Sequence, residues 1–287
     1  MNNINFILAF AIIVAYSPIL NASAFSEPVS EIRYVSISTA DVDETNATAR
    51  IGIDELSLKS ILTTKDVKNG KLIFSVDYKY TEFTVQDNTE QRTDVHQASL
   101  MARYITQRDK WRHIFSIAPG LYSDLEEITT DDLDVTASYN FMYSSSDQLQ
   151  WIAGIGYSRT FGDPIFFPII GATIQPNEYW QFKLGFPVSS ASYSPSSDWH
   201  SYVKLQPNGG KWNLDAKGSN DVNMIYSSFE LLAGIEKDLA KNLWLGIEAG
   251  YSFAREFEFN DASSNNSLGE VDLKDASFIA VNLRYKP

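Results

Sequence analysis

The sequence has no cysteine, only three histidines, and fewer basic than acidic residues. The absence of cysteine excludes a small secreted scaffold held together by disulfides, and no Cys/His metal-ligand spacing is present. Lys and Arg number 23 against 36 Asp and Glu, which gives a formal net charge of −13. Nucleic-acid binding depends on clustered basic side chains that neutralise phosphates. No such cluster exists, so no nucleic-acid partner is expected.

Long apolar runs are also missing after residue 24, where no stretch reaches the ~20 residues of a membrane-spanning helix. The run 6–20 near the start is short and contains Pro18. Ala22-Ser23-Ala24 follows it, with the small side chains that a signal peptidase accepts. We therefore predict a signal peptide over 1–24, although its first five residues lack Lys and Arg. An uncleaved anchor is the alternative, and 25–287 is expected to be one domain.

Period-two alternation is the dominant pattern of the remaining chain. In 72–81, 133–143 and 243–253, apolar residues alternate with polar or small ones. Successive side chains of a strand point to opposite faces, so each segment forms a strand with one apolar face. The alternation persists for about ten to thirteen residues, whereas globular strands cluster near 5–6 and bilayer-crossing strands need about 9–11. An all-β, antiparallel, up-and-down transmembrane barrel is favoured over a soluble β-sandwich.

Fourteen segments are predicted as strands, and the count falls to twelve if one weak pair stays outside the wall. Bacterial barrels have even strand numbers. The weak segments are 31–39, 50–59 and a hairpin around Pro207-Asn208-Gly209-Gly210. The fourteen segments are 31–39, 50–59, 70–83, 94–106, 111–122, 132–144, 148–160, 164–174, 178–187, 199–206, 211–217, 223–237, 242–255 and 270–285.

The links between these segments alternate in length. Long links are predicted at 84–94, 123–131, 188–198 and 255–272, and short ones at 106–110, 175–178 and 237–242. Short periplasmic turns and longer external loops are typical of transmembrane barrels.

Tryptophans follow the short turns, which predicts an aromatic girdle where indole rings meet the membrane–water interface. We place Trp199 near the external rim, and alternation points Trp244 into the lumen. The predicted girdle consists of Trp111, Trp151, Trp180 and Trp212.

The last strand alternates up to Tyr285, which looks like the terminal aromatic signal read by the barrel-assembly machinery. Lys286-Pro287 after it departs from the usual terminal Phe.

The hairpin around 167–187 carries a family resemblance. Its elements are Pro168-Ile169-Ile170-Gly171, the turn Gln175-Pro176-Asn177-Glu178, and Gly185-Phe186-Pro187, followed by Tyr193. The chain resembles a family of bacterial outer-membrane β-barrel proteins of unknown function. The resemblance implies fold and location, and it assigns no catalytic or binding residue. Physically, Pro168 and Pro187 indicate bulges, strand ends or a rim, because proline cannot donate to a sheet ladder.

Candidate chemistry is sparse, and no catalytic residue, cofactor or metal site is expected. His200 with Asp198 and nearby serines is the best enzymatic arrangement, for a lipid-modifying activity, but a triad needs convergence in space. The acidic stretch 124–134 has the charge to bind Ca²⁺ or Mg²⁺. It lacks the spacing and central Gly of a calcium loop, so a solvated loop is favoured.

Charges of both signs are predicted on the lumen face, where they can pair with one another. Three functions follow: a narrow channel for small solutes, a structural or surface-interaction barrel, and the lipid-modifying enzyme. The expected partners are outer-membrane lipid and lipopolysaccharide, plus the assembly machinery. The predicted lumen-lining residues are Asp77, Lys79, Arg103, Asp134, Lys183, Glu230, Glu248 and Arg284.

Overall fold

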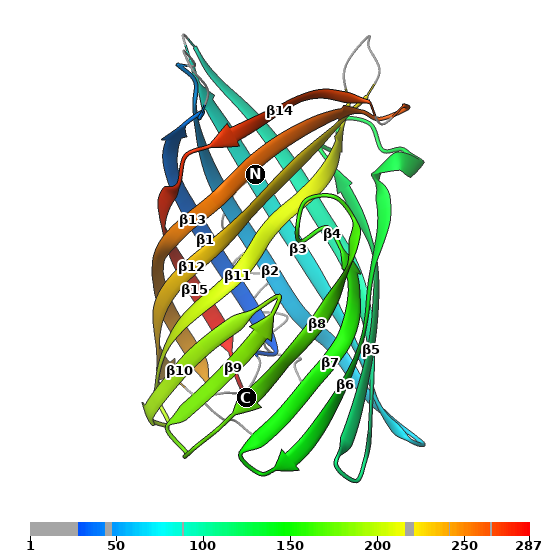
Figure 1. The fold of residues 1–287 in the computed structure, drawn as a ribbon, viewed down its shortest axis with the longest axis vertical. Helices are drawn as coiled ribbons and strands as arrows, with labels where there is room; N and C mark the ends of the chain where they lie inside the picture. Colours follow the sequence, from blue (N-terminus) through cyan, green and yellow to red (C-terminus); the bar gives the residue numbers. More distant parts are fainter. Residues whose placement is uncertain (1–27, 44–47, 88, 216–220, 241, 265) are drawn as a thin grey trace.

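The computed structural model is a single antiparallel sheet that curls into a barrel (Figure 1). It describes residues 28–287 except 44–47, 88, 216–220, 241 and 265, so the predicted signal peptide lies outside the described residues. Its elements are β1 (Ser30–Asp41), β2 (Arg50–Val67), β3 (Gly70–Gln86), β4 (Glu90–Arg108), β5 (Trp111–Ser123), the 3₁₀ turn η1 (Thr130–Asp132), β6 (Leu133–Ser146), β7 (Leu149–Ser158), β8 (Ile165–Ile174), β9 (Trp180–Phe186), β10 (Ser189–Ser196), β11 (Trp199–Leu214), β12 (Val222–Ala240), β13 (Leu243–Asp261), β14 (Ser267–Leu273) and β15 (Ala276–Tyr285).

The barrel closes because the last strand pairs with the first. β15 lies between β1 and β13, and β13 pairs with β12 on its other side. β14 and β15 share one position in the wall, since β14 pairs with 255–260 of β13 and β15 with 243–252. The fifteen strands therefore occupy 14 positions, and the predicted antiparallel barrel is confirmed.

The two ends of the barrel differ in their links. At one end, which we call the turn end, short turns such as 68–69, 109–110 and 147–148 join the strands. At the opposite, loop end, the links 42–49, 124–132 and 159–164 are longer. In Figure 1, β14 lies at the loop end and the C-terminus lies at the turn end. Among the described residues, no helix is long and apolar enough to cross a membrane.

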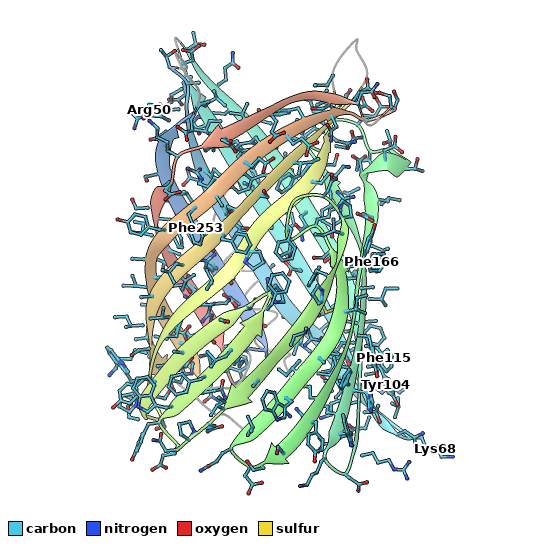
Figure 2. The ribbon with its side chains drawn as sticks, viewed as in Figure 1. Arg50, Lys68, Tyr104, Phe115, Phe166 and Phe253 are labelled. Atoms are coloured by element: carbon cyan, nitrogen blue, oxygen red, sulfur yellow. The ribbon has the colours of Figure 1, made fainter. Side chains whose placement is uncertain are left out.

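Side chains sort by face as the alternation predicts. On β12, Leu231 and Ile235 are each 48% exposed, whereas the adjacent Glu230 and Glu236 are each 1% exposed. Large apolar side chains project from the outside of the wall, as Phe115 and Phe166 do in Figure 2. Apolar groups thus cover the exterior, and the buried polar groups face inward.

Two predicted segments are wrong around the short β9–β10 hairpin. Residues 189–196, predicted within a long loop, form β10, and its links at 187–188 and 197–198 are short. The serine-rich stretch hides the strand because it has little apolar alternation. Conversely, Pro207-Gly210 is no hairpin, since β11 runs through it and pairs with β12 from Trp199 to Leu214.

Two prolines lie on the strand edges that remain unpaired on the loop-end side of that hairpin. β8 pairs with β9 only up to Ile170, and β10 pairs with β11 only up to Leu205. Pro168 and Pro207 lie just beyond these points, where the missing N–H removes no ladder bond to β9 or β10. The free edges explain how both prolines fit inside strands.

The β7–β8 link, which we call loop 159–164, fills the space between these edges. Its backbone packs on β11, where a Cβ at Gly209 would lie 3.1 Å from Thr160 O and from Gly162 N. Phe161 stacks on Phe186 with ring centroids 5.5 Å apart and contacts Phe229 at 6.1 Å. The loop therefore completes the wall where strands are missing.

An apolar cluster, defined here as Ile53, Phe83, Trp212, Tyr226 and Phe257, fills the interior toward the loop end. Phe83 is central, with ring centroids 5.2 Å from Phe257 and 5.9 Å from Trp212. The cluster lies where β5 and β11 touch through the single bridge between Ser123 and Asn213. This contact draws the wall inward, so the interior at this level is filled by side chains.

The predicted aromatic girdle needs two corrections. Trp212 is 1% exposed and belongs to the apolar cluster, because the predicted turn before it does not exist. Trp199 begins β11 at the turn end, where it pairs with Lys237, and it is absent from the external rim. Trp111, Trp151 and Trp180 are exposed near turn-end links, and Trp244 is buried inside.

We expect Trp212→Ala to lower the free energy of unfolding by about 3–5 kcal/mol, as for other large buried aromatics. Trp151→Ala, on the exposed exterior, serves as the control and should cost less. Urea titration of both variants in the same detergent measures the difference. Equal losses would show that the interior at Trp212 is not packed.

Candidate functional site

A polar cavity of about 480 Å³ occupies the interior on the turn-end side of the apolar cluster. Residues from β1–β4, β9–β13 and β15 line it, so most of the wall contributes. Inward-facing strand positions supply the polar side chains by the same alternation that makes the exterior apolar. Its charged lining consists of the cations Arg33, Lys59, Lys79, Lys183, Lys204, Arg284 and Lys286 and the carboxylates Glu31, Glu55, Asp77 and Glu248.

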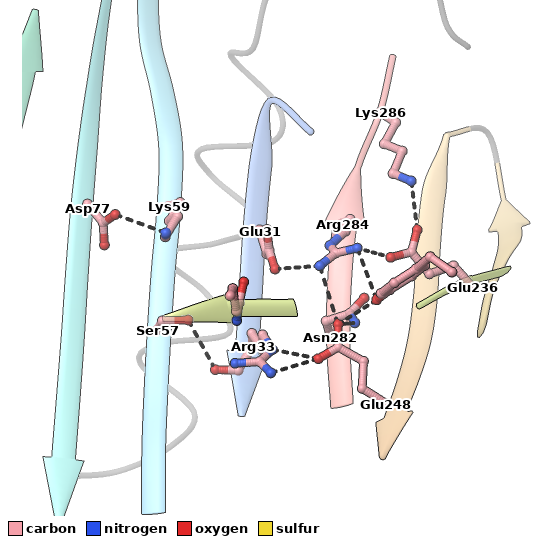
Figure 3. A network of polar contacts seen from close by, with 12 residues as sticks. Glu31, Arg33, Ser57, Lys59, Asp77, Glu236, Glu248, Asn282, Arg284 and Lys286 are labelled. Carbon is pink, nitrogen blue, oxygen red and sulfur yellow. Dashed lines mark hydrogen bonds and ion pairs between the residues drawn. The ribbon is translucent and has the colours of Figure 1, made fainter. Parts of the chain in front are cut away.

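Arg284 on β15 is the centre of an ion-pair network at the barrel seam (Figure 3). Its Nη2 lies 3.0 Å from Glu31 Oε1 and 3.6 Å from Glu248 Oε1, and its Nη1 donates to Glu236. Arg33 binds Glu248 at 2.7 Å, and Lys286 binds Glu236 at 2.7 Å. The network joins β1, β12, β13 and β15, the strands at which the sheet closes.

Two further ion pairs link the neighbouring strands β2 and β3. Lys59 Nζ lies 3.3 Å from Asp77 Oδ2, and Lys79 Nζ lies 3.6 Å from Glu55 Oε1. Lys79 also lies 5.7 Å from the ring centroid of Trp212, where the cavity meets the apolar cluster.

The structure brings five of the eight predicted lumen residues together at the cavity. These are Asp77, Lys79, Lys183, Glu248 and Arg284. Glu230 is buried and accepts from Gln206 Nε2 at 2.8 Å. Asp134 binds Arg159 beside loop 159–164 at 2.5 Å, and Arg103 pairs with Ile73 outside the cavity lining.

Sequence reasoning missed several charged residues that the cavity uses. Glu31 and Arg33 lie on β1, whose sequence alternates only weakly, and Lys286 follows the last predicted strand. Lys204 in the lining, and Glu236 behind it as the partner of Lys286, are next to exposed apolar residues, so the same alternation places both inside. The ion-pair partners of Arg33, Arg284 and Lys286 lie on strands far apart in sequence, and the pattern of a single strand does not reveal them.

Loop 159–164 separates the cavity from the exterior above the short hairpin. Thr160 lines the cavity, while the adjacent Phe161 packs on Phe186 and Phe229 in the wall. Arg159 binds Asp134 and donates to Lys211 O, and Asp163 accepts from Lys211 Nζ at 2.9 Å. Two ion pairs therefore hold this segment of the wall.

His200 and Asp198, the arrangement considered for an enzyme, contact different partners. His200 is buried, and its Nδ1 lies 2.8 Å from Ser194 Oγ. Asp198 lies in the exposed β10–β11 turn, where Ser196 Oγ donates to it at 2.6 Å and Lys237 pairs with it at 3.4 Å. These two contacts, the hydroxyl first, hold the pKa of Asp198 below its usual value. The Asp198 carboxylate is thus bound by Ser196 and Lys237 at the turn.

Two carboxylates of the acidic stretch 124–134 accept hydrogen bonds from nearby backbone N–H groups. Asp132 accepts from Thr129 N at 2.6 Å, closing a capping box on η1, and Asp124 accepts from Asp215 N at 3.0 Å. Within the described part of the chain, no group of three or more His, Cys, Asp or Glu is placed to hold a metal ion.

Residues 22–286 match a family described as a domain of unknown function, DUF6268. The chain belongs to this family. No curated protein matches it in sequence.

Among solved structures, the chain is similar to the COG4313 outer membrane channel from Pseudomonas putida F1. The two are 9% identical, with 94% of this chain and 99% of that chain covered and a TM-score of 0.49. It is also similar to the TodX monoaromatic hydrocarbon channel deltaS2 mutant, at 8% identity, 92% coverage of each chain and a TM-score of 0.47. The NanC porin gives 8% identity, coverage of 90% and 100%, and a TM-score of 0.38.

Arg284→Ala should be strongly destabilising, because it leaves Glu31, Glu236 and Glu248 with less compensation in the barrel interior. Breaking a buried ion pair by removing one partner costs about 3–5 kcal/mol. The control is Arg50→Ala, which removes the exposed pair with Asp41, and surface pairs are worth about 1 kcal/mol or less. Urea unfolding compares them, and similar losses would contradict the role of the network.

Proposed function

We propose that the chain is an outer-membrane β-barrel that forms a narrow channel for small polar solutes. The supporting observation is the separation of surfaces: an apolar exterior surrounds a polar interior with a cavity of about 480 Å³. In this proposal, the predicted signal peptide directs export, and the assembly machinery inserts the barrel. Membrane lipid and lipopolysaccharide contact the outside.

The exterior supports placement in a lipid bilayer. Ile247 is 57% exposed, Tyr251 62% and Ile279 66%, and these residues lie on neighbouring strands at the barrel seam. Soluble monomers seldom expose continuous apolar patches larger than a few hundred Å². Exposure of such a wall to water is unfavourable, at about 25 cal/mol per Å² of apolar surface. Contact with lipid removes that cost.

The size and filling of the interior support a narrow channel. Barrels of about eight strands are filled by side chains, and those of sixteen to eighteen leave an aqueous channel. This wall has 14 positions, and its interior is divided between a charged cavity and the apolar cluster. The apolar cluster is the barrier that a solute must pass on the axial route. Movement of loop 159–164 would provide the other route.

We predict that Ile279→Arg destabilises the barrel in lipid vesicles by about 2–4 kcal/mol, the cost of a charge facing the bilayer midplane. Glu127→Arg, in the exposed β5–β6 link, introduces the same side chain away from lipid and should have little effect. Denaturant unfolding in vesicles measures both. If Ile279→Arg is tolerated like Glu127→Arg, the exterior does not face lipid.

Conductance tests the channel itself. Purified protein in a planar bilayer should show small single-channel currents, and the double variant Phe83→Ala/Trp212→Ala should increase them by removing side chains from the apolar barrier. Retention of the folded form on unheated gels checks that the variant is intact. A silent bilayer for both proteins at high load would overturn the proposed channel. If Arg159→Ala alone increases current, solutes pass beside loop 159–164.

A further inference from the structure

The charges of the cavity do not balance. Five of the seven cations in its lining are paired: Arg33 with Glu248, Lys59 with Asp77, Lys79 with Glu55, Arg284 with Glu31, and Lys286 with Glu236. Lys183 and Lys204 make no ion pair with any described residue. The cavity lining therefore carries two ammonium groups without an ion-pair partner, within a chain whose net charge is −13, and the buried carboxylate of Glu230 outside the lining is held by the amides of Gln206 and Asn208.

Lys183 and Lys204 lie on strands β9 and β11, which are both paired with β10 between them. In the sheet register, Ser190 of β10 stands opposite Lys183 of β9 on one side and opposite Lys204 of β11 on the other. All three residues line the cavity. Because adjacent strands lie about 4.8 Å apart, the lysine Cα atoms are about 10 Å apart. Their flexible side chains can bring both ammonium groups to one small anion above the serine.

We propose that Lys183, Ser190 and Lys204 form a binding subsite for the carboxylate or phosphate group of a small solute. Lys183 is exposed to the cavity and Lys204 is half-buried in it, so both ammonium groups are accessible to a solute. A bound anion supplies the missing counter-charge through charge-assisted hydrogen bonds, and the Ser190 hydroxyl adds a neutral donor.

The next row of the same three strands offers neutral polar groups. Ser192 stands opposite Gln181 and Tyr202, and all three line the cavity. The side chains of Gln181 and Ser192 form no hydrogen bond with other described residues, while Tyr202 donates to Glu248 at 2.5 Å. An amide and a hydroxyl beside an anion subsite suit a solute that also carries hydroxyl groups. Binding pockets of about 300–1,000 Å³ hold small molecules, and the cavity of about 480 Å³ is within that range.

The subsite gives a solute class to the proposed channel, and its physiological role rests on that function. Anion binding itself does not, because it can be measured on the protein in detergent without any transport. The two ideas can therefore fail separately.

Isothermal titration calorimetry of the full-length mature protein in a non-ionic detergent tests the subsite. The probes are inorganic phosphate, glucose 6-phosphate and, as the uncharged comparison, glucose. We expect saturable binding of both phosphates, weakened by added salt, and no binding of glucose. Lys183→Gln/Lys204→Gln should weaken phosphate binding at least tenfold, and Lys183→Arg/Lys204→Arg, which keeps both charges, should retain it within about threefold.

The matched control is Lys59→Gln/Lys79→Gln, which removes the same charge from the same cavity but from cations that are already paired. It should weaken binding less than threefold. Equal losses in the two Gln doubles would overturn the assignment, because the whole cavity field would then attract the anion. Absence of phosphate binding by the wild-type protein would also overturn it, even where bilayer currents persist. Binding without any current would leave the subsite intact and count against the channel.

Discussion

The fold depends on the removal of free strand edges. A strand without a neighbour leaves backbone N–H and C=O groups unpaired, and in an apolar surrounding each such group costs free energy. Pairing of β1 with β15 closes the sheet and removes the free edges that these two strands would otherwise have. The exception lies above the short β9–β10 hairpin, where β8 and β11 face each other without strands between them. Proline at two positions of these edges and the packing of loop 159–164 replace the missing ladder.

The seam and the gap shape the interior in different ways. At the seam, β1, β12, β13 and β15 are joined by the Arg284 network, so carboxylates and cations replace the hydration that each would lose. At the loop end, the contact between Ser123 and Asn213 brings β5 and β11 together, and aromatic side chains fill the narrowed space. Charge therefore remains where the barrel is wide enough for a cavity.

Much of this fold was predictable because a strand's period of two is a local property of the chain. β3, β6, β13 and β15 show clear alternation, and the barrel follows from their length and even count. β10 was missed because Ser189–Ser196 has few apolar residues, and β11 was divided because Pro207-Gly210 has the composition of a turn. Free edges permit proline inside a strand, but only the pairing of neighbouring strands reveals which edges are free. The incorrect assignment of Trp212 to the aromatic girdle followed from the same error.

The candidate site was predictable in part, since alternation tells which residues face inward but not their height or partners. Five of the eight predicted charges meet at the cavity, whereas Asp134 lies near loop 159–164 because its partner, Arg159, is there. Ion pairing across the lumen also determines which charges are neutralised. Arg284 is compensated by Glu31 from a strand distant in sequence, while Lys183 and Lys204 lie on either side of Ser190 in the serine-rich strand β10. A local excess of cations is therefore a property of the closed barrel, which a chain with net charge −13 conceals.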